Sequence, residues 1–266
     1  MQYTNIHTHT TFSDGKNTPE EMIKKAIELG FASIGISDHS ETAFDSAYCM
    51  AAADYADYKS VVGDLKKKYG DRINVFCGIE RDSYSSAACE GFDYVIGSVH
   101  YILYRGEHLS VDFSLEKQTD AIQRCFGGDK MEYARRYYDI LAENVLRGGF
   151  EVLGHFDLLN KFGLFSDCSE TYQKIAFEAL DTALSAVPYL EMNTGAIARG
   201  YNAVYPADVF LRRIYEKGGK IVLNGDSHSA EALDCHFDQA LDALKKAGFS
   251  SVWQLRGKGW TEIPIS

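Results

Sequence analysis

Histidine and carboxylate side chains recur at one kind of position in this sequence, the end of a short apolar segment. His7 and His9 are two residues apart, as are Asp226 and His228, and residues two apart on a β-strand point the same way. Imidazole and carboxylate ligands without thiolates suit Zn²⁺, Fe²⁺ or Mn²⁺. The side chains that share this placement are His7, His9, Asp14, His39, Glu80, His100, His155, Asp226 and His228. They exceed the needs of one ion, so we expect a site for two or three divalent metal ions.

A cluster of divalent ions favours hydrolysis of a phosphate ester. Two ions about 3.5–4 Å apart can share and deprotonate a water, while the same cluster neutralises the phosphate oxygens. Three ions would bring +6, and Asp14, Glu80 and Asp226 bring −3, which leaves about +3 at the site although the whole chain carries −11. An acidic protein can therefore bind a phosphate here. The sequence contains no G-x-x-x-x-G-K-[ST] loop, which argues against nucleotide-driven phosphate transfer.

These side chains need a framework in which the ends of many strands meet. Apolar segments and helical patterns alternate along almost the whole chain, which is typical of buried parallel strands joined by helices. The repeat favours an α/β fold with a (β/α) barrel, whose active site lies at the C-terminal ends of the strands. Strands are expected at residues 3–9, 33–38, 73–80, 94–102, 151–155, 189–193 and 220–226, with a further strand at 251–255.

Helices are expected between these strands. The first has the clearest boundaries, because Thr18 is a good N-cap, Pro19 suits the first turn, Glu21 completes a capping box and Gly30 follows the end. Further helices are expected at residues 54–69, 130–147, 170–185, 207–217 and 237–247. The connections 40–53 and 103–128 are longer than a barrel loop needs, so we expect them on the rim of the active site. No linker divides the chain, which indicates a single domain over residues 1–266.

Composition narrows the partners and the compartment. The 266 residues include 38 acidic and 27 basic side chains, which weighs against a nucleic-acid or anionic-membrane partner. No segment approaches the ~20 apolar residues of a membrane span, and residues 1–7 lack the features of an export signal, so a cytoplasmic protein is expected. Six cysteines without a C-x-x-C pair are expected to be reduced and mostly buried.

The motifs around the expected ligands resemble those of the PHP (polymerase and histidinol phosphatase) family, in order and over nearly the whole chain. They are His7-Thr8-His9, Ser13-Asp14-Gly15, Ser37-Asp38-His39, Gly78-Ile79-Glu80, Ser98-Val99-His100, Gly154-His155 and Gly225-Asp226-Ser227-His228. Residues 154–157 and 191–194, followed by Arg199, are similar to the histidinol-phosphatase branch. The resemblance implies a distorted (β/α)7 barrel, TIM-barrel-like, with a trinuclear metal site at the C-terminal ends of the strands. It leaves residues 251–255 peripheral.

The resemblance also implies how the ligands divide among the ions. The first ion is assigned to His7, His9, Glu80 and Asp226. The second shares Glu80 and takes His100 and His155. The third takes Asp14, His39 and His228. Some members of the family have histidine at the position of Asp14.

The activity that the resemblance implies is hydrolysis of L-histidinol phosphate to L-histidinol and phosphate in histidine biosynthesis, by attack of a hydroxide that bridges two ions. Glu80, Asp226 and Arg199 are the expected catalytic residues. Arg199 is also expected to bind the phosphate, because a guanidinium fork suits that group, and Lys161 is a second candidate.

The remaining polar and aromatic candidates have less specific signals. The candidates for the amine and imidazole end of the substrate are Glu41, Phe44, Asp45 and Tyr48. Arg81 and Arg105 are as well explained by structural roles as by substrate binding. The two histidines outside the motifs, His108 and His236, are expected to be ordinary surface residues.

Two other functions stay open at this point. One is a PHP phosphoesterase with another substrate, such as a nucleotide, a sugar phosphate or a phosphotyrosine. The other is a metal-dependent binding module without catalysis, which would be expected to have lost ligands, and none is missing here. The expected partner is a small-molecule phosphate monoester, while the sequence leaves the oligomeric state open.

Overall fold

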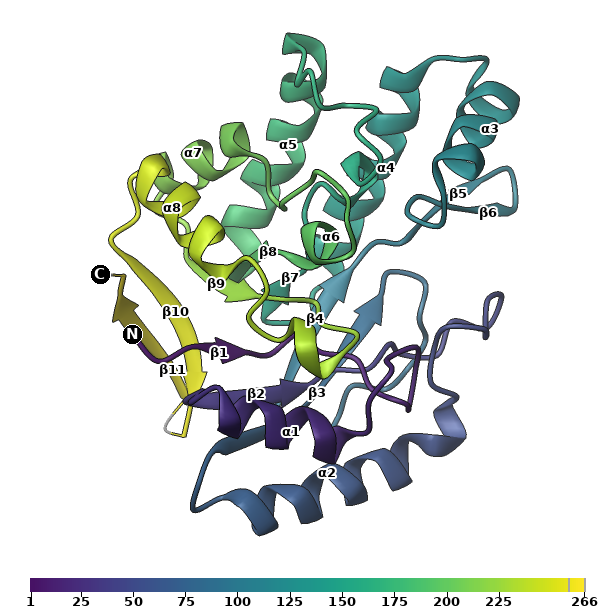
Figure 1. Cartoon of the computed structure of the whole chain (residues 1–266). Coiled ribbons are helices and arrows are strands. Elements are labelled where there is room, and N and C mark those ends of the chain that lie inside the picture. Colours follow the sequence, from purple (N-terminus) through teal and green to yellow (C-terminus); the bar gives the residue numbers. More distant parts are fainter. Residues whose placement is uncertain (258, 266) are drawn as a thin grey trace.

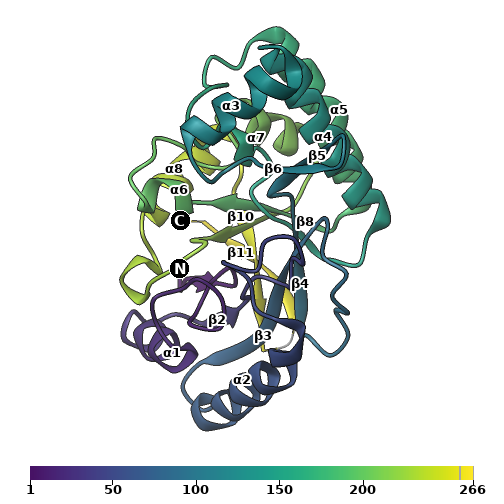
Figure 2. The same cartoon turned by 90° about the vertical axis from the view of Figure 1, so that its right-hand side faces the viewer.

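A curled nine-stranded sheet forms the centre of the computed structural model, which describes residues 1–257 and 259–265 (Figures 1 and 2). The strand order is β1-β2-β3-β4-β7-β8-β9-β10-β11. All neighbours are parallel except β10 and β11, which are antiparallel. The strands are β1 (Thr4–Asn5), β2 (Ser33–Ile36), β3 (Asn74–Asp82), β4 (Tyr94–Ser98), β7 (Val152–Leu153), β8 (Tyr189–Asn193), β9 (Ile221–Asn224), β10 (Ser251–Arg256) and β11 (Gly259–Pro264).

Helices cover the outside of this sheet. The helices are α1 (Pro19–Glu28), α2 (Tyr55–Tyr69), α3 (Leu115–Phe126), α4 (Lys130–Arg147), α5 (Glu170–Ala186), α6 (Gly195–Ala198), α7 (Asp208–Glu216) and α8 (Phe237–Ala247). Short 3-10 helices occur at η1 (Ala52–Asp54), η2 (Leu158–Asn160) and η3 (Ala230–Ala232). Helices α1 and α2 lie beside β2 and β3, while α4, α5, α7 and α8 cover the part that runs from β4 to β9 (Figure 1). The capping box of Thr18 and Glu21 that was predicted for the first helix is confirmed.

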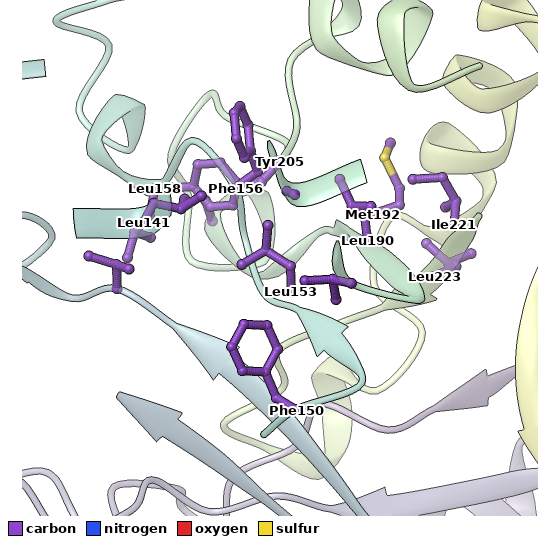
Figure 3. Packing of buried hydrophobic residues seen from close by; sticks show 14 of the residues in the cluster. Leu141, Phe150, Leu153, Phe156, Leu158, Leu190, Met192, Tyr205, Ile221 and Leu223 are labelled. Carbon is purple, nitrogen blue, oxygen red and sulfur yellow. The ribbon is translucent and has the colours of Figure 1, made fainter. Parts of the chain in front are cut away.

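Alternate residues on the strands supply two hydrophobic cores. Leu153 on β7 and Leu190 on β8 belong to the large outer core under the helices, part of which Figure 3 shows. Their neighbours Val152 and Tyr189 belong to a smaller core on the inner face of the curled sheet. This alternation is the expected consequence of the two-residue period of a strand. The inner core consists of Ile6, Tyr94, Ile96, Val152, Tyr189, Val222 and Leu255.

Tyr94 fills much of the space inside the sheet, and two glycines make room for its ring. A Cβ on Gly35 of β2 would lie 2.1 Å from the Tyr94 hydroxyl oxygen, and one on Gly78 of β3 would lie 2.2 Å from the ring. The hydroxyl donates a hydrogen bond to the Ile6 carbonyl. Any larger residue at these two positions would displace the ring and open the inner core.

The chain segments that follow β1 and β9 meet at the carboxyl end of the parallel strands. The His9 N–H donates to the Ser227 carbonyl (2.9 Å), and the Ser227 N–H donates to the His7 carbonyl (3.0 Å). At the amino end, β10 pairs with β9, and its Leu255 carbonyl accepts a hydrogen bond from Ser33 Oγ of β2 (2.6 Å). The chain segments that carry the expected ligands are therefore drawn together at the carboxyl end, and the β10–β11 hairpin fills the amino end.

Several expected strands differ in extent from the structure: 151–155 is reduced to β7 and 220–226 to β9, and the strands expected at 3–9 and 94–102 differ most. Regular pairing ends at Asn5 instead of residue 9, because the following backbone pairs only at the Thr8–Ser227 bridge. The strand expected at 94–102 is two strands in different sheets. The main sheet keeps β4, whereas β5 (Tyr101–Tyr104) pairs only with β6 (Glu107–Ser110). The break falls at His100, whose N–H donates to an Asp82 carboxylate oxygen.

Outside the core strands, one expectation is wrong. The segment 251–255 is not peripheral, since β10 extends the main sheet and Leu255 joins the inner core. The long connection 103–128 contains β6 and helix α3, which is capped by Ser114, and no strand or helix was expected there. The connection 40–53 is irregular up to η1, which starts at its end.

The structure also bears on the expected state of the cysteines and on the expectation that no segment spans a membrane. All six cysteines are free thiols, but only Cys77 is buried and the other five are half-buried, so the expectation of mostly buried thiols is wrong. Within residues 1–257 and 259–265, no helix combines the length and the apolar character needed to cross a membrane.

Candidate metal centre

The inner face of the sheet changes from apolar to polar toward the carboxyl ends of its strands. On β8, Tyr189 lies in the inner core, and Glu191 follows two residues later on the same face. On β9, Val222 lies in the inner core and Asn224 follows in the same way. The inner core therefore lies beneath a layer of polar side chains, and this polar layer carries the candidate metal ligands.

The structure brings all nine expected ligand side chains together in this polar layer. Their ligand atoms form four overlapping groups, and the atoms within each group lie within 4.8 Å of one another. The groups are His9, Asp14, His39 and His228; His7, His155 and Asp226; His7, His9 and Glu80; and His39, Glu80 and His100. The sharing differs from the division that the family resemblance implied, because His9 lies with the Asp14 group and His39 also approaches Glu80.

Glu80, near the end of β3, lies at the centre of the cluster and is fully buried. Its Oε1 is 3.0 Å from His155 Nε2, 3.3 Å from His7 Nε2 and 3.4 Å from His100 Nε2. Its Oε2 is 2.6 Å from His39 Nδ1. One carboxylate thus faces imidazoles from four different segments, which is the geometry needed to bridge two ions.

Several of these buried atoms have no hydrogen-bond partner among the described residues. They are Nε2 of His7, both ring nitrogens of His9, Oε2 of Glu80 and Nδ1 of His155. The nearest carboxylate oxygens of the His9 ring, for example, lie 4.0 Å from Nδ1 and 3.2 Å from Nε2, and neither contact is a hydrogen bond. A buried polar atom without a partner normally costs about 1–3 kcal/mol. Coordination of a divalent cation would satisfy these lone pairs, so the donor set fits such an ion.

His9, Glu80 and Asp226 have the charge states that metal ligation requires, whereas neighbouring carboxylates raise the pKa of His7, His39 and His100 against the effect of burial, so a metal ion would displace protons from these three imidazoles. Burial and the neighbouring His39 and His228 lower the pKa of His9 to about 3, so this imidazole is neutral at pH 7. Burial would raise the pKa of Glu80, but the surrounding imidazoles hold it well below its usual range. The same holds for Asp226, whose pKa is lowered chiefly by Arg199 against the effect of burial. Neutral imidazole and ionised carboxylate are the forms that bind metals.

The sequence analysis did not identify the carboxylates that accept hydrogen bonds from the candidate ligands or from the segments that carry them. Asp82 accepts a hydrogen bond at 3.1 Å from His100 Nδ1, and Glu191 accepts one at 2.7 Å from His7 Nδ1. Asp38 accepts hydrogen bonds from the Thr10 N–H and hydroxyl, both at 2.7 Å, and so orders the segment before Asp14. The signal in the sequence was a carboxylate within two residues of an expected ligand or inside a motif already singled out.

A cavity of about 480 Å³ opens onto the cluster, a size suited to a small-molecule substrate. Arg199 lies in its wall, with Nη2 3.1 Å from Asp226 Oδ2 and Nη1 3.1 Å from His228 Nδ1. Lys161 lies in the wall as well, and its Nζ donates to the carbonyl and to Oδ2 of Asp112 at 2.8 and 3.1 Å. Both expected phosphate-binding cations therefore border the cavity, and each is already paired with a carboxylate.

Only some of the other candidates reach this cavity. Asp45 and Tyr48 line it, with Tyr101 donating to Asp45 Oδ2 at 2.8 Å, whereas Glu41 and Phe44 do not. Arg81 has a structural role instead, since it donates to the Gly148 carbonyl at 2.6 Å.

Arg105, His108 and His236 are not among the residues that line the cavity. Arg105 occupies the turn between β5 and β6 with φ of 48°. His236 is exposed as expected, but His108 is half-buried and stacks on Phe44 at 3.6 Å between ring centroids, so the expectation of an ordinary surface residue is wrong for His108. Its stacking holds the hairpin against the 40–53 connection.

A curled parallel sheet that gathers imidazoles and carboxylates at the carboxyl ends of its strands defines a class of metal-binding α/β proteins. Within this class, the PHP domain family matches residues 5–195, and the chain belongs to that family. The match includes seven of the nine candidate ligands and ends before Asp226 and His228.

Two curated relatives cover most of the chain. A probable histidinol-phosphatase from Schizosaccharomyces pombe is 27% identical, over 88% of this chain and 82% of the relative. A probable histidinol-phosphatase from Deinococcus radiodurans is 26% identical, over 92% of this chain and 94% of the relative. Both alignments extend over nearly the full length of the fold.

A solved structure shares the fold over nearly its entire length. It is the histidinol phosphate phosphatase from Lactococcus lactis, in complex with Zn, L-histidinol and phosphate. The TM-score is 0.74 with 23% sequence identity, and the match covers 98% of this chain and 99% of the other. At this identity the likeness establishes the common fold.

Proposed function

We propose that this protein is a metal-dependent phosphatase that hydrolyses L-histidinol phosphate to L-histidinol and phosphate, as a step of histidine biosynthesis. The observation that carries the proposal is the cluster of buried imidazole and carboxylate atoms without hydrogen-bond partners, which borders a cavity with two cations in its wall. The names of the two curated relatives supply the substrate. PHP membership agrees with a metal-dependent phosphoester reaction.

The nine clustered side chains would hold two to three divalent ions, Mn²⁺, Zn²⁺ or Fe²⁺. When bound, such ions lower the pKa of a water molecule and neutralise the oxygens of a phosphate. Glu80 would fix the spacing of two ions, because its two oxygens face different imidazoles. Asp226 would complete the same part of the cluster. The remaining group of Asp14, His39 and His228 would hold the third ion.

The protein's own contribution to substrate binding comes from the wall of the cavity. Arg199 would exchange its contact with Asp226 for the phosphate, or bind both, since a guanidinium has five N–H donors. Lys161 would remain neutralised by Asp112 and act as a weaker second cation. The ring of Tyr48 and the carboxylate of Asp45 would face the rest of the substrate, which carries an amine and an imidazole.

The fold suits this function if the seven strands β1, β2, β3, β4, β7, β8 and β9 act as a distorted (β/α)7 barrel. The bridge between Thr8 and Ser227 supports that interpretation, because it joins the segments that follow the first and the last of these strands, at the end where the candidate ligands lie. The continuous outer core, which includes residues from α1 to α8, supports a single domain over residues 1–266.

The proposal is tested with a panel of phosphate monoesters and purified protein supplied in turn with Mn²⁺, Zn²⁺ and Fe²⁺. The panel contains histidinol phosphate, nucleoside monophosphates, sugar phosphates and phosphotyrosine. Histidinol phosphate is expected to give the highest kcat/KM. A higher value for another ester would assign the protein to a different PHP phosphatase activity, and no hydrolysis of any ester with bound metal would indicate a binding module.

A further inference from the structure

We propose that Glu191 is a positioning residue that fixes the proton of His7 on Nδ1 and thereby presents Nε2 of the same ring to a metal ion. Glu191 lies on β8 below the cluster and is 1% exposed. Glu191 is not among the residues that line the cavity, so it would affect a metal ion through His7. The inference rests on the proposed metal site, but not on the identity of the substrate.

The carboxylate of Glu191 is surrounded by four hydrogen-bond donors. Oε1 accepts from His7 Nδ1 at 2.7 Å and from Asn224 Nδ2 at 2.9 Å. Oε2 accepts from the His155 backbone N–H at 2.9 Å and from Asn193 Nδ2 at 2.8 Å. Two carboxylate oxygens offer about four acceptor sites, so the group is saturated.

The orientation of the two asparagine amides is fixed by the backbone. Asn193 Oδ1 accepts from the Gly195 N–H at 2.8 Å, and Asn224 Oδ1 accepts from the Ile6 N–H at 3.0 Å. Each amide must therefore turn its NH₂ group toward Glu191. The surroundings of Glu191 supply only donors, and His7 is the one donor that can also act as an acceptor.

The other side of the His7 ring faces the cluster. Nε2 has no hydrogen-bond partner among the described residues and lies 3.3 Å from Glu80 Oε1 and 3.8 Å from Asp226 Oδ1. A neutral imidazole that donates Nδ1–H to a carboxylate carries its lone pair on Nε2. Such carboxylate–histidine pairs orient metal-binding imidazoles, and their loss typically lowers metal affinity about 10- to 100-fold.

Substitution by glutamine reverses this arrangement without changing the shape of the side chain. A glutamine amide has one oxygen and one NH₂ group. If the NH₂ group faced the His155 N–H and Asn193, donors would meet donors on both sides. Beside His7 the NH₂ group would still face the Asn224 amide donor, but this orientation leaves one donor–donor contact instead of two if the imidazole accepts at Nδ1 and carries its proton on Nε2. That tautomer cannot bind a metal through Nε2.

The test compares Glu191→Gln with a matched control on the strand segment that carries His7. Thr8→Val removes the buried hydrogen bond from Thr8 Oγ1 to the Gly35 carbonyl (2.7 Å) without touching an imidazole. Zinc dissociation constants are measured by chelator competition, and the fold of each metal-free protein by circular dichroism and thermal unfolding. We expect the zinc dissociation constant to rise about 10- to 100-fold in Glu191→Gln and to stay unchanged in Thr8→Val.

Each outcome decides between positioning and support of the fold. A folded Glu191→Gln variant with wild-type zinc affinity would overturn the proposal, and so would an equal loss of affinity in Thr8→Val. If Glu191→Gln does not fold, long-range ¹H–¹⁵N spectra of the zinc-loaded wild-type protein give the answer, with His7 assigned from its substitution. A protonated Nδ1 and a coordinated Nε2 are expected, and the opposite tautomer would overturn the inference. A wild-type protein that binds no zinc would contradict the proposed function itself.

Discussion

Glu80 and Asp14 occupy very different places in the same cluster, although both are candidate metal ligands. Glu80 is fully buried and contacts imidazoles from four segments, whereas about a third of the Asp14 side chain is exposed, and its atoms lie 3.2 Å or more from His228, His39 and His9. In the proposed site, a change at the centre would therefore affect two ions, and a change at Asp14 would affect one peripheral ion.

We expect Glu80→Gln to reduce kcat/KM for histidinol phosphate far more than Asp14→Asn. Loss of a residue that merely supports a metal ligand already costs about 10- to 100-fold, so loss of the bridging ligand is expected to cost about 100-fold or more. The kcat/KM of Asp14→Asn is expected to remain within about 10-fold of the wild-type value, because Asp14 would hold only a peripheral ion. Steady-state kinetics at equal metal occupancy are the measurement. Equal losses in the two variants would contradict the central role of Glu80.

Arg199 is predicted to bind the phosphate of the substrate. A hydrogen bond between charged groups is typically worth about 1.5–3 kcal/mol, so Arg199→Ala is expected to lower kcat/KM by roughly 10- to 200-fold. Arg199→Lys should recover part of this loss, since it keeps the charge but not the fork. Metal content must be measured in parallel, because Arg199 also contacts Asp226.

The exposed Arg212 on α7 provides the matched control for loss of a guanidinium. Arg212→Ala is expected to leave kcat/KM and metal content unchanged. Wild-type efficiency of Arg199→Ala with its metals bound would exclude Arg199 as the phosphate-binding group and make Lys161 the next candidate.

At the scale of elements, Asp157 joins the end of β7 to the start of α7. Its Oδ2 accepts a hydrogen bond from the Ala207 N–H at 3.1 Å, while Oδ1 has no partner within the described part of the chain. Burial raises the pKa of this carboxyl to about 7. The folded protein therefore retains a proton that the unfolded chain has released above pH 4.

Stability is expected to fall between pH 4 and pH 7 because of Asp157, since the folded state binds more protons there. Asp157→Asn removes this loss and keeps an acceptor for Ala207. The variant should therefore have a higher free energy of unfolding than the wild type at pH 8, by up to about 4 kcal/mol for a shift of about three pKa units, and hardly any difference at pH 4. Urea unfolding at both pH values is the measurement. The prediction would be contradicted if the two proteins differed in free energy of unfolding by the same amount at both pH values. It would also be contradicted if the exposed control Asp208→Asn gave the same pH-dependent gain.

Sequence patterns predicted the elements of this fold better than their connections. The predicted bounds of α4 and α8 agree with the structure, because caps and amphipathic periods mark them locally. The break between β4 and β5 was missed because residues 94–102 are mostly apolar, and the polar Ser98 and His100 within them were interpreted as the end of one strand and not as a change of sheet. The hairpin turn at Arg105 and Gly106 lacks the usual Asn-Gly signal.

In the candidate site, too, residues marked by their local sequence were predicted, whereas contacts between residues far apart in the sequence were not. The nine clustered residues were predictable because they lie at or just beyond the ends of short apolar segments and the fold class brings strand ends together. Glu191 was not recognised as a partner of His7, since the residues are 184 positions apart and a two-residue period gives the face of a strand but not its neighbour. Distances across the sheet supply that missing information.

For the whole molecule, bound metal ions are expected to stabilise the folded state. Purified protein is expected to contain two to three transition-metal ions per chain by elemental analysis. Because the ions bind the folded cluster, chelation should lower the melting temperature. Each site saturated at about 100 times its Kd contributes about 2.7 kcal/mol. At most one ion per chain under metal-replete conditions, with activity intact, would contradict the multinuclear site.

Metal-dependent hydrolysis is best tested by the rate of phosphate release from L-histidinol phosphate by one preparation in three states: as purified, metal-free, and resupplied with Zn²⁺ or Mn²⁺. We expect hydrolysis in the first state, loss of hydrolysis in the second while the protein stays folded, and recovery in the third. Undiminished hydrolysis by metal-free protein, or none by folded protein with its metals bound, would contradict this expectation.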